Sequence, residues 1–243
     1  MLMRSAAIAP IVTVGIMLGT VVAIRVGAAN PLYGFGIFVL SWALGGLISI
    51  ALGLLAWRRA RKDSRSPAAG QRGFLGGALL MIALVTATLR IGAPPIHDIT
   101  TSPDDAPAYR TALHHEDNAS RDLTYPEGGG EVIAEQRRAY PDLRPIELDL
   151  DPDAAHAAAL EAAEGIGLAI SFSSRVEGRI EAYSVSSVFA FVDDFVVRVR
   201  PAISGSVIDV RSTSRVGRSD LGANAARIRS FAEALGAPFA PQP

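Results

Sequence analysis

The stretch from Asp209 to Arg229 holds the side chains of this sequence that are best suited to chemistry. It reads DVRSTSRVGRSDLGANAARIR and contains five arginines, two aspartates and three serines. Guanidinium groups bind carboxylates and phosphates through paired hydrogen bonds, and the N-terminus of a helix offers further N–H donors to an anion. Because Arg215, Arg218 and Arg227 surround the expected start of a helix, they form the best candidate for an anion-binding site.

The segments that lead into this cluster form a predicted β-hairpin. Apolar and polar residues alternate over residues 195–200 and 207–214, and Ser204–Gly205 between them is typical of a turn. Helices must cover the apolar face of such a hairpin. Its charged face is therefore expected to be open to water or to a partner.

The charged face of this hairpin adds two residues to the candidate site. A two-residue turn places Arg200 opposite Asp209, as an ordinary ion pair, and Arg198 opposite Arg211, as two like charges. Two facing arginines are tolerated where an acid such as Glu181, or a bound anion, lies between them. The tentative anion site therefore also contains Arg198 and Arg211. A network of salt bridges among residues of the sheet is the other interpretation.

Four residues near the cluster are interpreted as parts of the fold. Asp209 belongs to the cross-strand ion pair, and Gly217 supplies a turn conformation that other residues avoid. Asp220 or Ser219 is expected to cap the last helix, since short polar side chains accept hydrogen bonds from the free N–H groups there. Asn224 is a poor helix former, and a hydrogen bond from its side chain to a neighbouring strand or loop would explain its position.

Recognisable catalytic motifs are absent from the sequence. No serine of the stretch has a nearby histidine base, and no phosphate loop or dinucleotide fingerprint occurs. Asp193 and Asp194 with Asp209 could serve a hydrolase or transferase, but adjacent acids at the start of a strand are common. His114 and His115 diverge on a helix and are poor joint ligands for a metal. We therefore expect neither a metal nor a cofactor.

Three uncharged apolar segments fill the first part of the chain. They run from Ser5 to Ile24, from Val26 to Trp57 with a break at Asn30–Pro31, and from Gly73 to Leu89. A helix needs about 20 mostly apolar residues to cross a bilayer, and inside lipid a single segment satisfies its backbone only as a helix. Residues 1–96 are therefore predicted to be a three-span membrane region, with spans at about 6–28, 32–57 and 73–95.

The loop between the second and third spans sets the predicted orientation. It reads RRARKDSRSPAAGQR, and short loops rich in arginine and lysine stay in the cytoplasm. The N-terminus is then cytoplasmic, and the residues from His97 onward lie in the periplasm, outside the inner membrane. A cleaved signal peptide ending near VGAAN is the alternative for the first span, but its apolar core is too long for one.

Charge is unevenly distributed along the chain. Residues 1–96 carry nine basic residues and one acidic residue, whereas residues 97–243 carry 14 basic and 23 acidic ones. The acidic excess is concentrated in residues 97–164, so a nucleic-acid partner is not expected. The sequence has no cysteine, which excludes disulfides and thiolate chemistry.

The part that follows the spans is predicted to be an α+β domain. Prolines and glycines punctuate residues 97–145, with short helices before His114 and over Glu131–Arg138. We call residues 97–145 the wrapping segment, because they are expected to wrap the rest rather than form a core of their own. Residues 146–243 have the order β-α-β-β-β-β-α, an antiparallel sheet with two helices on one face. The strands are predicted at residues 146–150, 168–173, 179–187, 195–200 and 207–214, and the helices at 152–165 and about 221–235.

Several segments of this domain resemble one protein family. VRSTSRVGRSDLGANAARIR, preceded by FVDDFVVRVRP and, earlier, by IHDITT and AYPDL, is similar to the bacterial and plastid family called domain of unknown function 1499. The resemblance covers about residues 96–236. It implies N-terminal membrane spans in many members, and no established activity, cofactor or substrate.

Together these features predict a membrane-anchored envelope protein without catalytic activity, whose periplasmic domain binds a protein partner or an anionic ligand. The lipid bilayer is its expected surrounding, and an envelope protein or a small anion is its expected partner. A periplasmic hydrolase or transferase that acts on an anionic substrate is the alternative.

Overall fold

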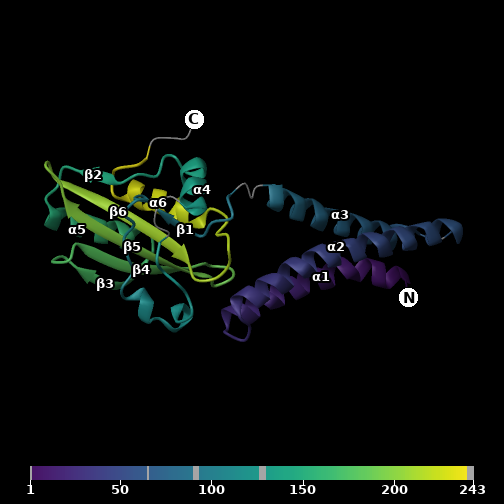
Figure 1. Ribbon diagram of the computed structural model, residues 1–243. Helices are drawn as coiled ribbons and strands as arrows, with labels where there is room; N and C mark the ends of the chain where they lie inside the picture. Colours follow the sequence, from purple (N-terminus) through teal and green to yellow (C-terminus); the bar gives the residue numbers. More distant parts are fainter. Residues whose placement is uncertain (1, 65, 90–92, 126–129, 240–243) are drawn as a thin grey trace. The chain divides into compact units, whose positions relative to one another are not determined.

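The computed structural model describes residues 2–64, 66–89, 93–125 and 130–239 (Figure 1). The chain divides into two compact units. One comprises Met1–Gly92 together with Ser187–Ala190, and we call it the helical unit. The other comprises Ala93–Ser186 together with Phe191–Pro243, and we call it the α+β unit.

The helical unit contains the three predicted apolar helices. They are α1 (Leu2–Arg25), α2 (Pro31–Lys62) and α3 (Ala68–Leu89). Each includes a stretch that is long and apolar enough to cross a membrane. The predicted third span extends over residues 90–92, which lie outside the described residues.

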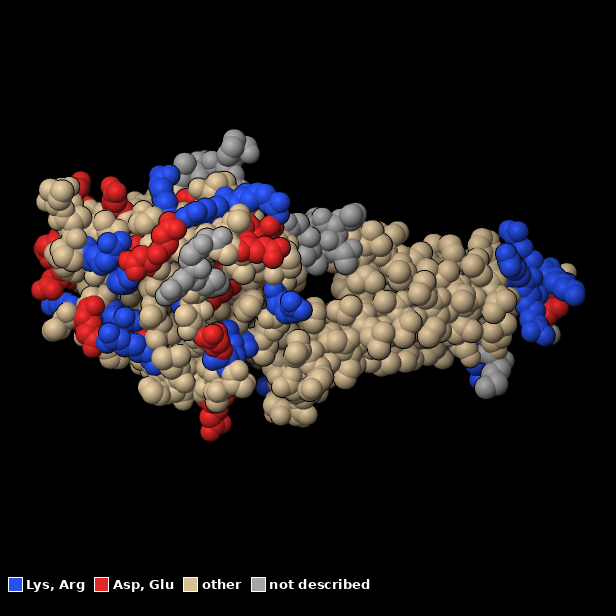
Figure 2. Space-filling view, viewed as in Figure 1, with Lys and Arg blue, Asp and Glu red and all other residues tan. Residues whose placement is uncertain are grey.

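Both ends of α2 follow from the local sequence. Pro31 occupies its first turn, and Asn30 Oδ1 accepts hydrogen bonds from the N–H groups of Leu32 and Tyr33. The last turn carries basic side chains, and their positive charge interacts favourably with the negative end of the helix dipole. Figure 2 shows Lys and Arg side chains gathered at one end of an otherwise nearly uncharged helical unit.

Glycines in α2 and α3 let the three helices approach closely. A Cβ atom added at Gly77 of α3 would lie 2.7 Å from the carbonyl oxygen of Gly46 in α2. One added at Gly73 of α3 would overlap the carbonyl oxygen of Ala6 in α1 and lie 3.3 Å from the Cα of Gly53 in α2. Close van der Waals packing of this kind is a main source of stability between helices in lipid, where no hydrophobic effect acts between them.

The α+β unit is built on an antiparallel sheet with the order β1-β6-β5-β4-β3, in which β2 also pairs with β6. The five predicted strands are present. The additional strand β1 has three residues and lies in the wrapping segment, where the sequence predicts no strand. The outer edge of β6 is shared, because β2 pairs with its beginning and β1 with its end. The strands are β1 (Asp98–Thr100), β2 (Ile146–Leu148), β3 (Ala169–Ser174), β4 (Arg179–Val185), β5 (Val192–Pro201) and β6 (Ser206–Ser214).

The two predicted long helices pack on one face of this sheet (Figure 1). Helix α5 (Pro152–Gly165) begins after Asp151, whose Oδ1 accepts two backbone N–H groups, and α6 (Ala223–Ala234) follows β6. Their apolar residues form the main core with alternate residues of the strands. Members of that core include Ala159, Phe195, Val197, Val210, Ile228 and Phe231.

The charged face of the hairpin is covered, which corrects the prediction of an open face. Asp209 and Arg211 of β6 are 0% and 1% exposed. The wrapping segment lies over them, and three of its residues form a second, small core with Val196 of β5. These are Tyr109, Ala112 and Leu123. The wrapping segment also contains α4 (Glu131–Ala139) and the 3-10 turns η1 (Ala112–His114) and η2 (Glu116–Asn118).

The register of the β5–β6 hairpin also differs from the predicted one. Pro201 pairs with Ser206, so the turn has four residues, 202–205, rather than two. Arg198 consequently lies opposite Asp209, and Arg211 lies opposite a valine. The difference is two residues, which keeps every side chain on its predicted face and removes the like-charge pair.

The glycine contacts of the helical unit lead to the first prediction. We expect Gly73→Ala to destabilise the full chain in detergent by about 1–3 kcal/mol, because its Cβ meets backbone that cannot move aside. Gly15→Ala is the matched control, since a Cβ at Gly15 meets no atom within 4 Å. Thermal unfolding followed by circular dichroism measures both, and equal midpoints for the two variants would contradict the packing described here.

Candidate functional site

The buried carboxylate of Glu181 in β4 fixes the wrapping segment to the sheet. Its oxygens accept hydrogen bonds from the backbone N–H groups of Arg110, Thr111 and Ala112, at 2.8, 2.8 and 3.0 Å. Converging N–H groups of this kind form a concave site for an anion, and here the anion belongs to the chain itself. The sequence suggests that Glu181 could lie between Arg198 and Arg211. Its carboxylate instead binds the backbone of the wrapping segment.

Arg211 of β6 is bound on all sides although its charge is removed from water. Its Nε and Nη2 donate to the two carboxylate oxygens of Asp98 at 2.9 and 2.7 Å. Its Nη1 and Nη2 also donate to the carbonyl oxygens of Pro107 and Leu123, at 3.2 and 2.8 Å. Burial by itself lowers the pKa of Arg211, but the hydrogen bonds and charge of Asp98 outweigh it and the pKa is raised.

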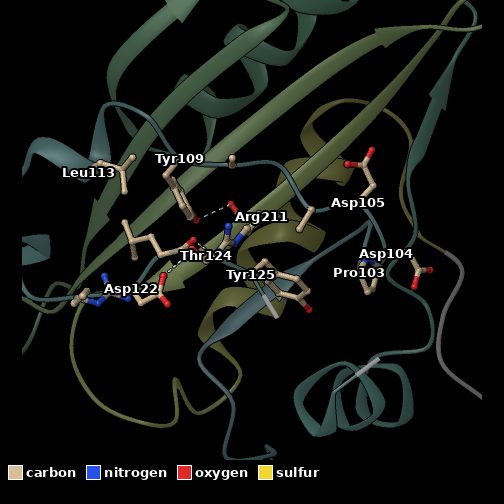
Figure 3. A pocket seen from close by; sticks show the side chains of 13 residues that line it. Pro103, Asp104, Asp105, Tyr109, Leu113, Asp122, Thr124, Tyr125 and Arg211 are labelled. Atoms are coloured by element: carbon tan, nitrogen blue, oxygen red, sulfur yellow. Dashed lines mark hydrogen bonds between the residues drawn. The ribbon is translucent and has the colours of Figure 1, made fainter. Parts of the chain in front are cut away.

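Two tyrosines of the wrapping segment flank the Arg211 guanidinium (Figure 3). Its central carbon lies 4.8 Å from the centre of the Tyr109 ring and 5.1 Å from that of Tyr125. The Tyr109 hydroxyl donates to the carbonyl oxygen of Asp194 or of Arg211, and that of Tyr125 to Gln136 Oε1. Burial raises the pKa of both tyrosines, so both stay neutral.

Arg215, just after β6, holds a second buried carboxylate. Its Nη2 and Nε donate to Asp194 at 2.8 and 3.1 Å, and its Nη1 lies 3.1 Å from Asp117 and 2.8 Å from His115 Nδ1. Asn118 Nδ2 donates to the same Asp194 carboxylate at 2.9 Å. Burial acts to lower the pKa of Arg215, but the hydrogen bond with Asp194 outweighs it and the pKa is raised.

Asp209 lies beneath two arginines of β5. Its carboxylate accepts from Arg198 Nη2 and Nε at 2.8 and 3.0 Å, and from Arg200 Nε at 2.6 Å. Arg198 also reaches outward to the carboxylate of Asp105 in the wrapping segment, at 2.8 Å. This chain of charges crosses from the buried strand to the surface.

Arg227 belongs to α6, and its side chain contacts the face of the sheet that the helices cover. Its Nη2 donates to Asp193 at 2.7 Å, and its Nη1 donates to Asn224 Oδ1 and Ser212 Oγ at 2.8 and 3.1 Å. Asn224 is itself fully buried, and its Nδ2 donates to the carbonyl oxygen of His97 at 2.9 Å. Arg227 and Asn224 therefore join α6 to β5, to β6 and to the start of the α+β unit.

The turn between β6 and α6 holds the last candidate arginine. Gly217 has a φ of +90°, which favours glycine. Asp220 accepts hydrogen bonds from the N–H groups of Gly222 and Asn224, both at 2.8 Å, although the cap position of α6 is Gly222, later than predicted. Arg218 is exposed, and it has no carboxylate partner within the described ranges.

The five candidate arginines do not converge on one anion site. Arg198, Arg211 and Arg215 lie on the face covered by the wrapping segment, and Arg227 lies on the helix face. All four are already paired with carboxylates of the chain. Arg218 is the one candidate of the five without a carboxylate partner among the described residues, and it remains available to an external anion.

The three aspartates of the enzyme alternative are held apart as well. Asp193 and Asp194 are neighbours in β5 and therefore point to opposite faces. Asp209 is enclosed by its two arginines. Over the same residues, no group of three or more His, Asp or Glu side chains is placed to hold a metal ion.

A pocket of about 720 Å³ opens within the wrapping segment, over Arg211 (Figure 3). We call it the acidic pocket, because the exposed carboxylates of Asp104, Asp105 and Asp122 line it. The exposed side chain of Leu113 lines it as well. The tyrosines that flank Arg211 also line it, and so does Arg121. The sequence does not predict this pocket, since a loop-rich segment has no periodicity from which its path could be read.

The sequence also leaves unpredicted which acids pair with which arginines, although the segments that carry the family resemblance contain them. Asp98, the partner of Arg211, stands in IHDITT. Asp142, in AYPDL, accepts from Arg229 at 2.6 and 2.8 Å. Asp193 and Asp194 stand in FVDDFVVRVRP. The early segments therefore supply the carboxylates, and the last segment supplies the arginines.

Two arginines that are three residues apart are expected to differ in their contribution to the free energy of unfolding. Arg215→Ala leaves the buried Asp194 without its main partner and is expected to lower the free energy of unfolding by about 3–5 kcal/mol. Arg218→Ala removes an exposed side chain and is expected to change it by about 0.5 kcal/mol or less. Urea unfolding of the full chain in detergent, followed by tyrosine fluorescence, compares them. Similar losses in both variants would show that the assignment of Arg215 to the fold is wrong.

Comparisons with known proteins bear on the family and not on the activity. Neither the curated proteins nor the solved structures give a match. A family model described as protein of unknown function (DUF1499) matches residues 98–235, more than half of the chain. The matched residues run from β1 to the end of α6 and include every ion pair described above. This chain therefore belongs to the DUF1499 family, with three apolar helices ahead of the matched region.

Proposed function

We propose that this protein is a non-catalytic envelope protein, anchored in the inner membrane, whose α+β unit lies in the periplasm and binds a protein partner. The three apolar helices and the basic loop between α2 and α3 support this topology, because such loops stay in the cytoplasm. With that loop inside, the N-terminus is cytoplasmic and the α+β unit lies on the outer side.

The observation that carries the binding proposal is the charge at the acidic pocket. Three carboxylates face two guanidinium groups there, and both guanidiniums belong to internal pairs: Arg211 is bonded to Asp98, and Arg121 lies 3.9 Å from Asp194. The carboxylates of Asp104 and Asp105 are paired as well, with Arg137 and Arg198, but their side chains are 80% and 68% exposed. Asp122 is exposed and has no ion pair among the described residues. The mouth of the pocket is therefore negative.

Two of these carboxylates stay ionised even in mildly acidic solution. The hydrogen bond from Arg198 lowers the pKa of Asp105, and the backbone N–H of Thr124 lowers that of Asp122. Asp104 is 80% exposed at its side chain, with one surface ion pair to Arg137. Surface pairs of this kind exchange easily with an incoming cation, since they contribute little stability.

The chemistry of the pocket indicates a basic side chain of the partner as the inserted group. The carboxylates would accept hydrogen bonds from a guanidinium or ammonium group. The aliphatic stem of an arginine or lysine would pack on Leu113, which is 50% exposed. An anionic ligand is less favoured at the paired arginines, because it would have to displace a carboxylate of the chain.

The topology is tested by fusions at two positions. We expect alkaline phosphatase to be active when fused after Ile96 and inactive when fused after Lys62, because the enzyme folds only outside the cytoplasm. A fluorescent protein that requires the cytoplasm should show the opposite pattern at the same two positions. Fluorescence from the fusion after Ile96 would contradict the periplasmic placement.

The binding proposal is tested by photo-crosslinking in cells. A benzophenone amino acid at Leu113 is expected to give a discrete protein adduct that the same amino acid at Val176 does not give. Val176 is a suitable control because it is fully exposed on the turn between β3 and β4. The double change Asp104→Asn and Asp122→Asn should reduce the adduct about tenfold, the effect of roughly 1.4 kcal/mol. An adduct insensitive to these charges, or equal at the two positions, would refute a basic partner.

A further inference from the structure

The turn Arg215–Gly222, between β6 and α6, is held against the first residues of the α+β unit. The backbone N–H of Asp220 donates to the carbonyl oxygen of Ile96, and Ser219 Oγ donates to that of Pro94, both at 3.4 Å. A Cβ atom added at Gly222 would lie 3.6 Å from the Cβ of Ala93. We call this turn the exit turn, because the first described residues after α3 contact it.

Chain length limits how far the exit turn can be from the end of α3. The helix ends at Leu89, and Ala93 is four residues further along. A fully extended chain covers at most about 3.6 Å per residue, so the two positions are separated by no more than roughly 14 Å. This limit follows from covalent geometry alone and holds for every arrangement of the two units. A candidate span therefore keeps the exit turn within reach of the headgroup layer, which extends about 5–8 Å beyond each side of the hydrocarbon.

The side chains of the exit turn suit that layer. Val216 and Leu221 are 38% and 52% exposed, although both are apolar. Between them stands Arg218, exposed and without an acidic partner in the part of the chain that the structure describes. Apolar residues beside an arginine are typical of segments at a membrane surface, and a guanidinium binds a phosphate through two parallel hydrogen bonds.

Exposure of apolar residues alone would not indicate lipid. Ile203 at the tip of the β5–β6 hairpin is also fully exposed, but it lies at the other end of β5. That strand has ten residues, a length of about 33 Å at 3.3 Å per residue. The exit turn differs from the hairpin tip because it combines apolar exposure, an arginine without an acidic partner among the described residues, and a short tether to a candidate span.

We propose that the exit turn lies in the headgroup layer of the bilayer that holds the apolar helices, with Val216 and Leu221 among the lipids and Arg218 bound to a lipid phosphate. This inference goes beyond the proposed partner binding, which uses other residues, and either can fail without the other. It also assigns a role to Arg218, the candidate arginine that has no carboxylate partner among the described residues.

The absence of cysteine from the sequence makes a direct test straightforward. Single cysteines in place of Val216, Leu221 or Ile203 would carry a nitroxide label in the full chain, reconstituted in nanodiscs of phosphatidylcholine and phosphatidylglycerol. Oxygen concentrates in lipid and a nickel chelate in water, so the ratio of their collision rates with the label reports its depth. We expect this ratio to be several-fold higher at residues 216 and 221 than at residue 203. Equal ratios at the three positions would overturn the proposal.

The role of Arg218 is tested in the same preparation. Arg218→Ser, combined with the label at residue 221, is expected to lower the collision ratio toward that of residue 203, whereas Arg218→Lys should retain most of it. Because Arg218 has no described partner in the fold, circular dichroism should show unchanged folding in both variants. An unchanged ratio in Arg218→Ser would refute the phosphate contact. Loss of the ratio on adding 50 mM inorganic phosphate, roughly the concentration that saturates a millimolar site, would assign Arg218 to free phosphate instead of lipid.

Discussion

A guanidinium group that is buried on a sheet must bring a carboxylate with it, and most of the α+β unit is arranged around this constraint. Removing a charge from water costs several kcal/mol, and only a partner with well-placed hydrogen bonds compensates for the loss. Arg211 meets the condition through Asp98 and two carbonyl groups, and Arg215 meets it through Asp194. The Arg211–Asp98 pair joins segments 113 residues apart, and Arg215 also reaches Asp117 of the wrapping segment, 98 residues away. The wrapping segment is therefore needed to neutralise the sheet, in addition to shielding it.

The same constraint separates the residues that hold the fold from those that remain free to act. An arginine already bonded to a buried carboxylate has few donors left, and releasing it would leave that carboxylate unpaired. Among the described residues, Arg218 is the candidate arginine without a carboxylate partner, and Asp122 is the acid of the acidic pocket without an arginine partner. They have opposite charge and lie in different parts of the α+β unit. Most arginines of the last family segment consequently stabilise the fold by pairing with its carboxylates and are not free to bind a ligand.

The sequence predicts the periodic parts of this fold well. The apolar helices, the five predicted strands and the helices α5 and α6 all follow from apolar spacing and cap residues, because each of these signals is local. The path of the wrapping segment does not follow, since its contacts are made by single side chains such as Glu181 and Tyr109 at long range. The hairpin register depends on whether the turn has two or four residues, and Ser204–Gly205 is compatible with either. A register error of two residues leaves each side chain on its predicted face, because side chains alternate between the two faces of a strand.

The order of the segments also determines how the unit can fold. β1 and the wrapping segment come first in the chain, yet their partner β6 comes about 110 residues later. Closing so long a loop costs conformational entropy before any contact compensates for it, so the charged face of the sheet is covered late. Without β6, Asp98 and Asp194 lack Arg211 and Arg215 as partners, so burying either carboxylate would carry an uncompensated desolvation cost. The buried ion pairs therefore favour this single arrangement over its competitors, because in any other arrangement the carboxylates and guanidiniums would be buried without each other.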